Sequence, residues 1–323
     1  MLIEKGYDVH GIVRRASTSK TTSRIEHIDE LILHRGDLID QGCLIDLVKE
    51  VEPDEVYNLG AMSFVPTSWD QPEQTMQVTG MGVLRMLEAC RQGAPGIKFY
   101  QAGSSEMFGK VAEEPQKETT KFHPRSPYGC AKAYGYHITQ NYRESYDMFC
   151  SNGILFNHES ERRGLEFVTR KISHHVAKQV LGLTDLPLEL GNMDAKRDWG
   201  HARDYVEAMW LMLQHDKPDD FVVATGKTHT VRDFVNAAYE AAEIGVIWRG
   251  DGVDEVGVTA EEVGVMQGEL LVQVNPKFFR PAEVWTLTGD PTKAIETLGW
   301  EPKYDMETLA AAMVKHDLNL LAD

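Results

Sequence analysis

The chain has 323 residues, enough for one large domain or two modest ones. Apolar residues make up 42% and charged residues 26%, as in an ordinary soluble globular protein. Lys and Arg number 33 against 50 Asp and Glu, a formal net charge of −17. This charge repels phosphate backbones and anionic lipids, so we expect no nucleic-acid or membrane partner. An anionic substrate would need local arginines.

The cysteine pattern and the first residues indicate the compartment. Cys43, Cys90, Cys130 and Cys150 form no C-x-x-C pair and have no zinc-ligand spacing with histidine. We interpret them as small core residues in a reducing compartment and predict no metal site. Residues 1–6 lack the basic and apolar regions of a signal peptide, and no apolar run approaches the roughly 18 residues of a membrane span. We expect a cytoplasmic protein.

The first 155 residues alternate short apolar segments with helical stretches. We expect strands at residues 7–13, 31–34, 55–59, 97–102 and 149–155, and helices at 41–51, 72–91 and 127–146. The apolar strands indicate burial on both faces, and most connections are long enough for a crossover helix. The pattern predicts an α/β fold with a Rossmann-like, doubly wound parallel sheet.

The chain begins inside one of these units. Residues 1–5 are typical of the last turn of a helix, and Gly6 fits the position just past its end. In a dinucleotide-binding fold, such a helix follows a strand and a G-x-G-x-x-G turn, and neither occurs in this sequence. We therefore expect the first strand and glycine-rich loop to be missing, which would leave the middle of the sheet unpaired.

After residue 160 the alternation becomes less regular. We expect a helix at 199–213, a last sheet strand at 221–224, a helix at 231–242, strands and loops over 244–275, and a helix at 305–321. This pattern predicts a smaller substrate-binding region interleaved with the sheet domain. We assign residues 1–160 and about 194–226 to the sheet domain, and residues 161–193 and 227–323 to the smaller region.

The strongest chemical signal is Tyr128 followed four residues later by Lys132. On a helix these side chains share a face, with Ser104 at a strand end about 24 residues upstream. A nearby ammonium lowers the pKa of a tyrosine from about 10, so we predict that Tyr128 is a general base for a hydroxyl proton while hydride leaves the same carbon. The alternative is a surface Tyr and Lys on an amphipathic helix.

A strand-end serine followed by Tyr-x-x-x-Lys resembles the extended short-chain dehydrogenase/reductase superfamily. Within it, several strings are similar to the GDP-mannose 4,6-dehydratase family: EVYNLGAMS (55–63), PQKETT (115–120), RSPYG (125–129), NYRESY (141–146), NGILFNHES (152–160), GNMD with RDWGHARDYV (191–206) and FRPAEV (279–284). The likeness covers nearly the whole chain.

The resemblance implies an internal redox cycle on GDP-mannose, with NADP as a tightly held cofactor. Tyr128 would deprotonate the 4-hydroxyl as hydride leaves carbon 4, assisted by Ser104 and Lys132. Glu106 would remove the proton on carbon 5 and assist loss of the 6-hydroxyl as water, and hydride would return to carbon 6. The product would be GDP-4-dehydro-6-deoxymannose. The alternative interpretation of Glu106 is an exposed loop acid.

The cofactor candidates lie mostly in the first half. Arg14 and Arg15 follow the strand expected at 7–13, where a basic residue favours NADP by pairing with a 2′-phosphate; the alternative is a solvated arginine pair. The resemblance implies that Asp37 and Leu38 flank adenine. It also implies cofactor contacts at Leu59, Gly60, Ala61, Met62, Ser63, Tyr128, Lys132, His158 and Arg163. Without it, His158 would be interpreted as a structural histidine.

For the substrate, Arg197 and Arg280 can clamp a pyrophosphate, and Glu283 can accept hydrogen bonds from a ribose diol or a guanine edge. The resemblance adds Asn157, Thr169 and Lys171. We interpret Arg162, Arg170 and Arg203 as surface charges.

Ser104 stands where the family commonly has threonine, and Gln74 where tyrosine is expected as a cofactor contact. Two other functions remain open. One is a related nucleotide-sugar epimerase or reductase, although Glu106 argues against a simple reductase. The other is a non-catalytic fragment that binds a nucleotide sugar. The resemblance also implies a homodimer or homotetramer.

Overall fold

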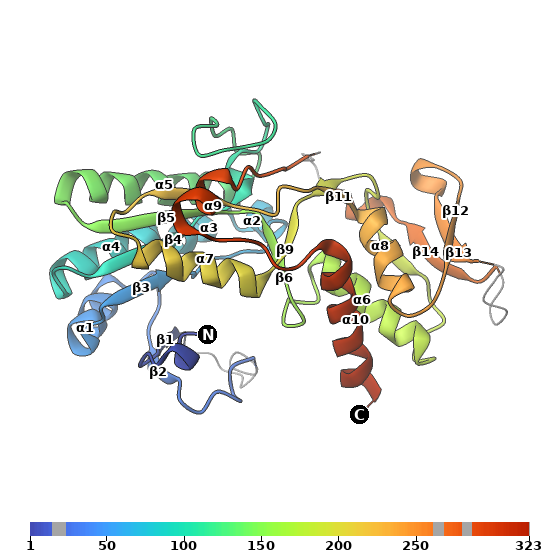
Figure 1. Ribbon diagram of the computed structural model, residues 1–323, viewed down its shortest axis with the longest axis horizontal. Helices are drawn as coiled ribbons and strands as arrows, with labels where there is room; N and C mark the ends of the chain where they lie inside the picture. The colour runs from blue at the N-terminus through green and yellow to red at the C-terminus, as the bar shows by residue number, and fades with distance from the viewer. Residues whose placement is uncertain (15–23, 261–267, 280–285, 323) are drawn as a thin grey trace.

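The computed structural model describes residues 1–14, 24–260, 268–279 and 286–322. A larger α/β part carries the N-terminal half of the chain, and a smaller part lies beside it (Figure 1). Three predicted site residues, Arg15, Arg280 and Glu283, lie outside the described residues.

The central sheet has four parallel strands in the order β10-β5-β4-β3. They are β3 (Glu55–Asn58), β4 (Lys98–Ala102), β5 (Phe149–Leu155) and β10 (Asp220–Val223). β10 is buried throughout, as are β4 and β5 beyond their first residue, as expected for a sheet covered on both faces. The predicted parallel sheet is confirmed.

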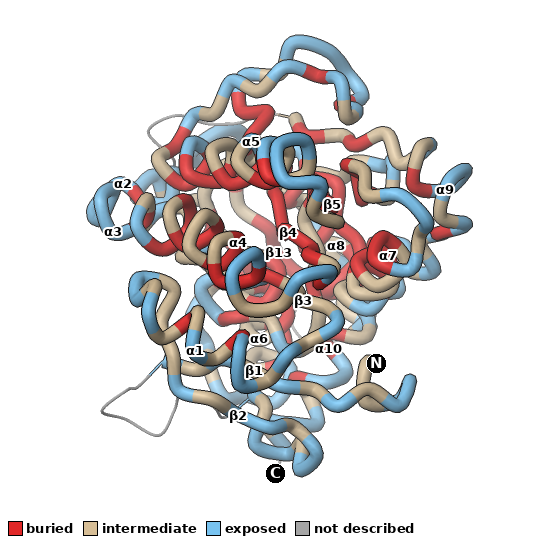
Figure 2. Tube along the Cα trace, turned by 90° about the vertical axis from the view of Figure 1, so that its left-hand side faces the viewer, coloured by how far each residue is buried: buried red, intermediate tan, exposed pale blue. Residues whose placement is uncertain are grey.

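Helices cover both faces of this sheet because successive residues of β4 point to opposite sides. On one face, α1 (Gln41–Val51), α4 (Met81–Gly93) and α5 (Pro127–Tyr146) pack around Phe99. On the other, α7 (Ala202–Gln214) and α9 (Thr292–Leu298) pack around Tyr100 and Trp300. Figure 2 shows the buried residues concentrated between these layers. The doubly wound arrangement predicted from the sequence is confirmed.

A separate parallel pair lies beside the central sheet (Figure 1): β1 (His10–Val13) with β2 (Ile32–Arg35). Among the described residues, no strand joins this pair to β3, which agrees with the predicted unpaired middle. The chain enters β1 from η1 (Ile3–Lys5), a 3₁₀ turn that ends at Gly6 with φ of 84°, the predicted helix end.

The helix predicted at 72–91 is divided into three segments. After α2 (Thr67–Asp70), the chain forms α3 (Pro72–Thr75), a π-helical turn η3 (Met76–Gly80) and α4. The π turn presents Thr79, whose Oγ1 accepts a hydrogen bond of 3.0 Å from the backbone N–H of Met62. The interruption therefore anchors the loop of residues 59–63.

The smaller part has its own core around a mixed sheet in the order β12-β13-β14-β7. Its elements are β7 (Leu188–Leu190), β12 (Val246–Arg249), η5 (Gly252–Asp254), β13 (Val256–Thr259), β14 (Leu270–Val274), η7 (Pro276–Phe278), α6 (Val168–Val180), α8 (Val231–Glu240) and α10 (Met306–Ala322). Arg170 on α6 forms a buried ion pair with Asp317 on α10. The interpretation of Arg170 as a surface charge is therefore wrong, because it joins two helices of this core.

Short strands connect the two parts. β6 (Asn157–Glu159) pairs in parallel with β9 (Trp199–His201), and β8 (Lys196–Arg197) pairs antiparallel with β11 (His229–Thr230). The helix predicted to begin at 199 therefore begins later. The His201 side chain accepts a hydrogen bond of 3.1 Å from Arg203 N and caps α7, which leaves Trp199 in a strand.

The C-terminal region returns to the sheet before it ends. Leu287, Ala294 and Trp300 are fully or almost fully buried in clusters that include sheet residues, and Trp300 Nε1 donates a 2.7 Å hydrogen bond to Asp204 O. The division of the chain into two regions stays a prediction. Within it, residues 287–300 were assigned to the smaller region, but they pack with the sheet. In the part of the chain described, no helix is long and apolar enough to cross a bilayer.

A buried polar network fixes α5 against the sheet. Asp220 at the start of β10 accepts hydrogen bonds from Arg143 (3.0 Å twice), Tyr136 (3.0 Å), Gln140 (2.7 Å) and Asn152 (2.8 Å). Burial alone would raise the pKa of Asp220, but the Arg143 pair and the amide donors hold it below its usual value. The carboxylate is therefore the common acceptor of the helix and the central strands.

We predict that Asp220→Asn lowers the free energy of unfolding by about 3–5 kcal/mol, because it leaves the Arg143 guanidinium without its buried counter-charge. Because the pKa of Asp220 is lowered in the folded state, its contribution is present above the unfolded pKa and lost as pH falls through the folded value. Urea titrations at pH 7 measure the loss. Asp219→Asn, at a half-exposed neighbour, is the control and should change stability little. Equal effects of the two substitutions would contradict the prediction.

Candidate active site

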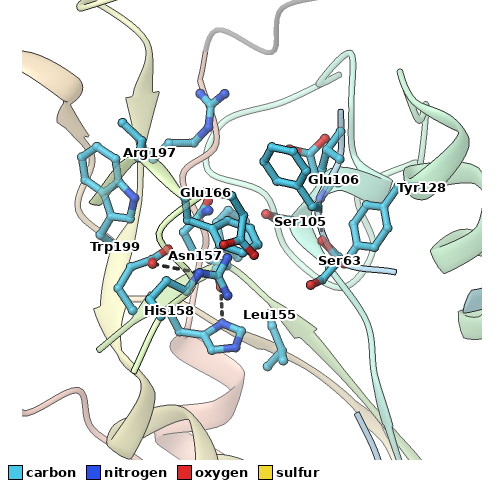
Figure 3. A pocket seen from close by; sticks show the side chains of 18 of the residues that line it. Ser63, Ser105, Glu106, Tyr128, Leu155, Asn157, His158, Glu166, Arg197 and Trp199 are labelled. Carbon is cyan, nitrogen blue, oxygen red and sulfur yellow. Dashed lines mark hydrogen bonds and ion pairs between the residues drawn. The ribbon is translucent and has the colours of Figure 1, made fainter. Parts of the chain in front are cut away.

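A cavity of about 870 Å³ lies between the two parts of the chain. Ser63, Glu106 and Tyr128 line one side, and Asn157, His158, Arg197 and Trp199 line the other (Figure 3). The first group comes from the ends of β3 and β4 and the start of α5, and the second from β6, β8 and β9. The cavity therefore meets the carboxyl ends of the parallel strands, where α/β sheets bind ligands.

The start of α5 places Tyr128 and Lys132. Ser126 Oγ accepts a hydrogen bond of 3.0 Å from Gly129 N, and Pro127 occupies the first helical position, so the helix begins at a defined residue. Lys132 is 4% exposed, and its Nζ donates a hydrogen bond of 2.7 Å to Ala102 O at the end of β4. The predicted sharing of one helix face is confirmed by their common place on the cavity wall.

Ser104 and Glu106 follow β4 directly. Ser104 Oγ accepts a hydrogen bond of 3.2 Å from Glu106 N and caps η4 (Ser105–Met107), and Ser104 lines the cavity together with Tyr128. A Cβ on Gly129 would lie 2.7 Å from the Glu106 carbonyl oxygen. Close contact between this turn and α5 thus brings Glu106 and Tyr128 to the same wall.

The pKa of Tyr128 differs from the expectation. Its pKa is raised to about 12, mainly by burial and also by the nearby charge of Glu106, while Ser104 and Arg163 act in the lowering direction. The prediction that the Lys132 ammonium lowers the pKa of Tyr128 from about 10 toward the working pH is wrong for this structure. The Lys132 ammonium is held by Ala102 O and lies 5.8 Å from the Tyr128 ring centroid.

Burial also acts on Lys132 and lowers its pKa to about 8. At pH 7 most of the side chain still carries its proton, so the cation persists. Its Nζ has further N–H donors besides the one that bonds to Ala102 O, and the side chain lines the cavity. Lys132 can therefore donate to a ligand hydroxyl from a fixed position.

His158 on the opposite wall is held as a neutral ring. Burial lowers its pKa to about 4. The ring Nδ1 lies 2.8 Å from Phe156 O, which is a hydrogen-bond donor position in the neutral form, and the ring stacks on Tyr205 at 4.7 Å. Nε2 is then the acceptor. Arg163, the other predicted contact on this wall, also lines the cavity.

The predicted substrate residues do not all reach the cavity. Asn157, Lys171 and Arg197 line it. Lys171 Nζ donates a hydrogen bond of 2.6 Å to Glu189 O and lies 3.8 Å from the centroid of the Phe278 ring. Thr169 is fully buried outside the lining, and its hydroxyl donates to Glu159 instead.

The predicted cofactor loop lines the cavity with alternate residues. Leu59, Ala61 and Ser63 face it, whereas Gly60 and Met62 do not. A Cβ on Gly60 would lie 2.6 Å from Leu38 Cδ1, so the loop packs against the segment after β2.

The remaining cofactor candidates lie beyond the lining of the cavity. Asp37 precedes Leu38 and accepts a 3.2 Å hydrogen bond from Ile39 N. Arg14 is exposed at the end of β1.

Several lining residues were not predicted from the sequence: Phe64, Glu159, Glu166, Phe167, Trp199 and Phe278. Most belong to no spaced motif, and aromatic residues in loops carry no local signal for a cavity. Phe167 and Phe64 meet edge to face at 5.7 Å, one from each part of the chain. Among the described residues, no group of three His, Cys, Asp or Glu is placed to hold a metal ion.

We predict that Gly129→Ala lowers the unfolding midpoint, although alanine normally favours a helix over glycine by about 1 kcal/mol. The added Cβ would meet the Glu106 carbonyl, a backbone atom that has little freedom to move. Gly42→Ala in the first turn of α1 is the control, because its Cβ would make only an ordinary contact of 3.6 Å with Asp40. Thermal unfolding measures both; a Gly129→Ala protein as stable as Gly42→Ala would refute the close packing.

Comparison with known proteins agrees with this geometry. Among solved structures, UDP-glucose 4-epimerase from Thermus thermophilus in complex with NAD superposes with a TM-score of 0.79 at 25% identity, covering 98% of this chain and 93% of that one. RMD from Pseudomonas aeruginosa complexed with NADPH has a TM-score of 0.75 at 23% identity, covering 90% and 91%. The second likeness shows the fold alone.

Sequence comparison is more specific. The GDP-mannose 4,6 dehydratase family model matches residues 1–313. GDP-mannose 4,6-dehydratase from Yersinia enterocolitica is 54% identical, covering 98% of this chain and 89% of the relative. GDP-mannose 4,6 dehydratase from Homo sapiens is 52% identical, covering 99% and 87%. These matches, over the residues that build the cavity, show that the chain belongs to the GDP-mannose 4,6-dehydratase family.

Proposed function

We propose that this chain is an NADP-dependent dehydratase that converts GDP-mannose to GDP-4-dehydro-6-deoxymannose. The observation that carries the proposal is the shared wall formed by Ser104, Glu106, Tyr128 and Lys132 at the carboxyl ends of the strands. A base for a hydroxyl and a separate carboxylate are the groups that oxidation followed by elimination requires. Membership of the family supplies the substrate class.

The cavity residues fit a nicotinamide dinucleotide. Lys132 and Tyr128 offer hydrogen-bond donors for a ribose. His158 offers an imidazole ring that is uncharged at neutral pH. Leu59, Ala61, Ser63 and Arg163 line the same cavity. We extend the proposed cofactor contacts to Asp37, Leu38, Gly60 and Met62. When bound, the cofactor accepts a hydride from carbon 4 and returns it to carbon 6. The preference for NADP rests on Arg14 and Arg15 after β1.

The protein's part in oxidation belongs to Tyr128. Its phenol oxygen takes the proton of the 4-hydroxyl as the hydride leaves carbon 4, which converts the alcohol to a ketone. Ser104, whose hydroxyl acts to lower the pKa of Tyr128, supports this step. Because burial raises the pKa of Tyr128, additional positive charge near the phenol must favour the phenolate during turnover.

Glu106 carries out elimination. A ketone at carbon 4 acidifies the proton on carbon 5, and the carboxylate removes it. The proton then leaves with the 6-hydroxyl as water, which leaves a double bond between carbons 5 and 6. Hydride addition at carbon 6 and protonation at carbon 5, which uses the equivalent of the proton that Tyr128 took from the 4-hydroxyl, give the 6-deoxy product with no net change in the cofactor.

Arg197 and Lys171 supply positive charge for the GDP pyrophosphate against the acidic background, and Asn157 supplies an amide for the hexose. We extend the proposal to Arg280 and Glu283 as nucleotide contacts. We also propose that residues 1–160 with about 194–226 bind NADP, that residues 161–193 and 227–323 bind the nucleotide sugar, and that the enzyme is a cytoplasmic homodimer or homotetramer. The alternative function, an epimerase or a reductase, leaves Glu106 without a role, because neither reaction needs a base for elimination at carbon 5.

We predict that Tyr128→Phe lowers kcat by about 10²–10⁴-fold, the typical contribution of a general base, and leaves GDP binding unchanged. A coupled assay of water loss from GDP-mannose measures turnover, and calorimetry measures GDP affinity. Tyr134→Phe, which removes a hydroxyl from the same helix outside the cavity lining, should retain normal turnover. Normal activity of Tyr128→Phe would remove this residue from the proposed role.

We predict that Glu106→Gln still oxidises carbon 4 but does not eliminate water. Reduced cofactor should then accumulate to about one equivalent per site, visible as nicotinamide absorbance in the near ultraviolet, because no acceptor forms at carbon 6. Glu144→Gln on an exposed position of α5 is the charge-matched control and should turn over normally. Deoxysugar formation by Glu106→Gln at the wild-type rate would contradict the assignment, whereas net consumption of NADPH by the wild type would indicate a reductase.

We predict that Arg14→Asp weakens binding of NADP relative to NAD by about tenfold or more, the value of a hydrogen bond to a charged group. Lys49→Asp, the same charge change at an exposed position of α1, should leave the NADP-to-NAD ratio unchanged. The ratio of kcat/KM for the two cofactors is the measurement. An unchanged ratio in Arg14→Asp would assign that side chain to the solvated surface.

A further inference from the structure

Glu159 is a buried carboxylate that the proposed reaction does not use. It is the last residue of β6, directly after the cavity residues Asn157 and His158, and it is 2% exposed. Its Oε2 accepts a hydrogen bond of 2.8 Å from Thr169 Oγ1 and lies 3.1 Å from Arg163 Nε. Since an unpaired carboxylate is costly to bury, these two partners account for its presence in the cavity wall.

Arg163 is held on two sides. On one side, Glu159 forms an ion pair with its Nε, which lacks the alignment of a hydrogen bond. The guanidinium carbon lies 3.5 Å from the centroid of the Phe167 ring, and Phe167 in turn contacts Phe64. Glu159 fixes the Nε edge of the planar guanidinium and Phe167 fixes one face, so the two Nη groups point in a defined direction.

The Nη edge of Arg163 is available to a ligand. The side chain lines the cavity and is 25% exposed, and among the described residues its Nη1 and Nη2 find no hydrogen-bond acceptor. The chain carries a net charge of −17, so a fixed cation in this cavity is a strong local attraction for an anion. A phosphate group matches the paired N–H donors of such an edge.

We propose that Glu159 is a positioning residue that orients Arg163 toward a phosphate of the dinucleotide cofactor. The inference rests on the proposed function, in which this cavity binds NADP. In this role Glu159 acts only through the guanidinium of Arg163. Thr169, expected from the resemblance to contact substrate, serves here as the second support of the Glu159 carboxylate.

A double-mutant cycle tests this role by direct binding. The dissociation constant of NADPH is measured by fluorescence titration for wild type, Glu159→Gln, Arg163→Ala and the double variant. We expect each single substitution to weaken binding about tenfold, and the double variant to bind no more weakly than Arg163→Ala, because residues that act as one unit are not additive. Fully additive effects, or wild-type affinity in Glu159→Gln, would overturn the proposal.

Two further variants separate positioning from general charge and from folding. Glu161→Gln removes a neighbouring negative charge that faces His201 at 3.8 Å rather than Arg163, and it should bind NADPH like the wild type. Arg163→Lys retains the charge but not the Nε edge, so it should bind as weakly as Glu159→Gln while unfolding at the wild-type midpoint. Wild-type affinity in Arg163→Lys would also refute the role, even if Glu159→Gln proved too unstable to measure.

Dehydration of GDP-mannose by the wild type is assayed separately. The wild type could dehydrate GDP-mannose while Glu159→Gln binds NADPH with wild-type affinity. That pair of results would overturn only the positioning role. The proposed function would then stand, because its own tests depend on Tyr128 and Glu106 and not on this ion pair.

Discussion

The hydrogen bond from Lys132 Nζ to Ala102 O is the constraint on which the candidate site depends. It joins the helix that carries Tyr128 to the end of the strand that leads into Ser104 and Glu106. The ammonium is buried, so it requires an acceptor, and the strand-end carbonyl is a fixed one. The network around Asp220 holds the same helix further along its length, which leaves the wall of the cavity little freedom to change shape.

Local sequence signals predicted most of the sheet domain. The bounds of the helices Gln41–Val51 and Pro127–Tyr146 and of the strand Phe149–Leu155 match the structure because periodicity, capping residues and turn residues coincide there. The π turn at Met76–Gly80 and the strand Trp199–His201 were not predicted, because contacts with distant residues produce them. A hydrogen bond to Met62 and pairing with β6 leave no trace in local composition.

The site divides in the same way. The wall with Ser104, Tyr128 and Lys132 was found from spacing alone, since a catalytic helix face and a strand end impose a fixed pattern. The pKa of Tyr128 was not, because desolvation depends on everything packed around the ring and here exceeds the effect of the neighbouring cation. The opposite wall relies on ion pairing and aromatic packing between segments that are brought together only by the fold.

The π-helical turn before α4 has a consequence for how the protein tolerates change in length. A π turn holds one residue more than the α-helical turn it replaces, so the flanking helices keep their phase around it. Loss of one residue from Met76–Gly80 would let the helix run on regularly, with Leu87 still in the core. The hydroxyl of Thr79 would no longer accept the hydrogen bond from Met62 N, so the damage would appear in the loop of residues 59–63 rather than in folding.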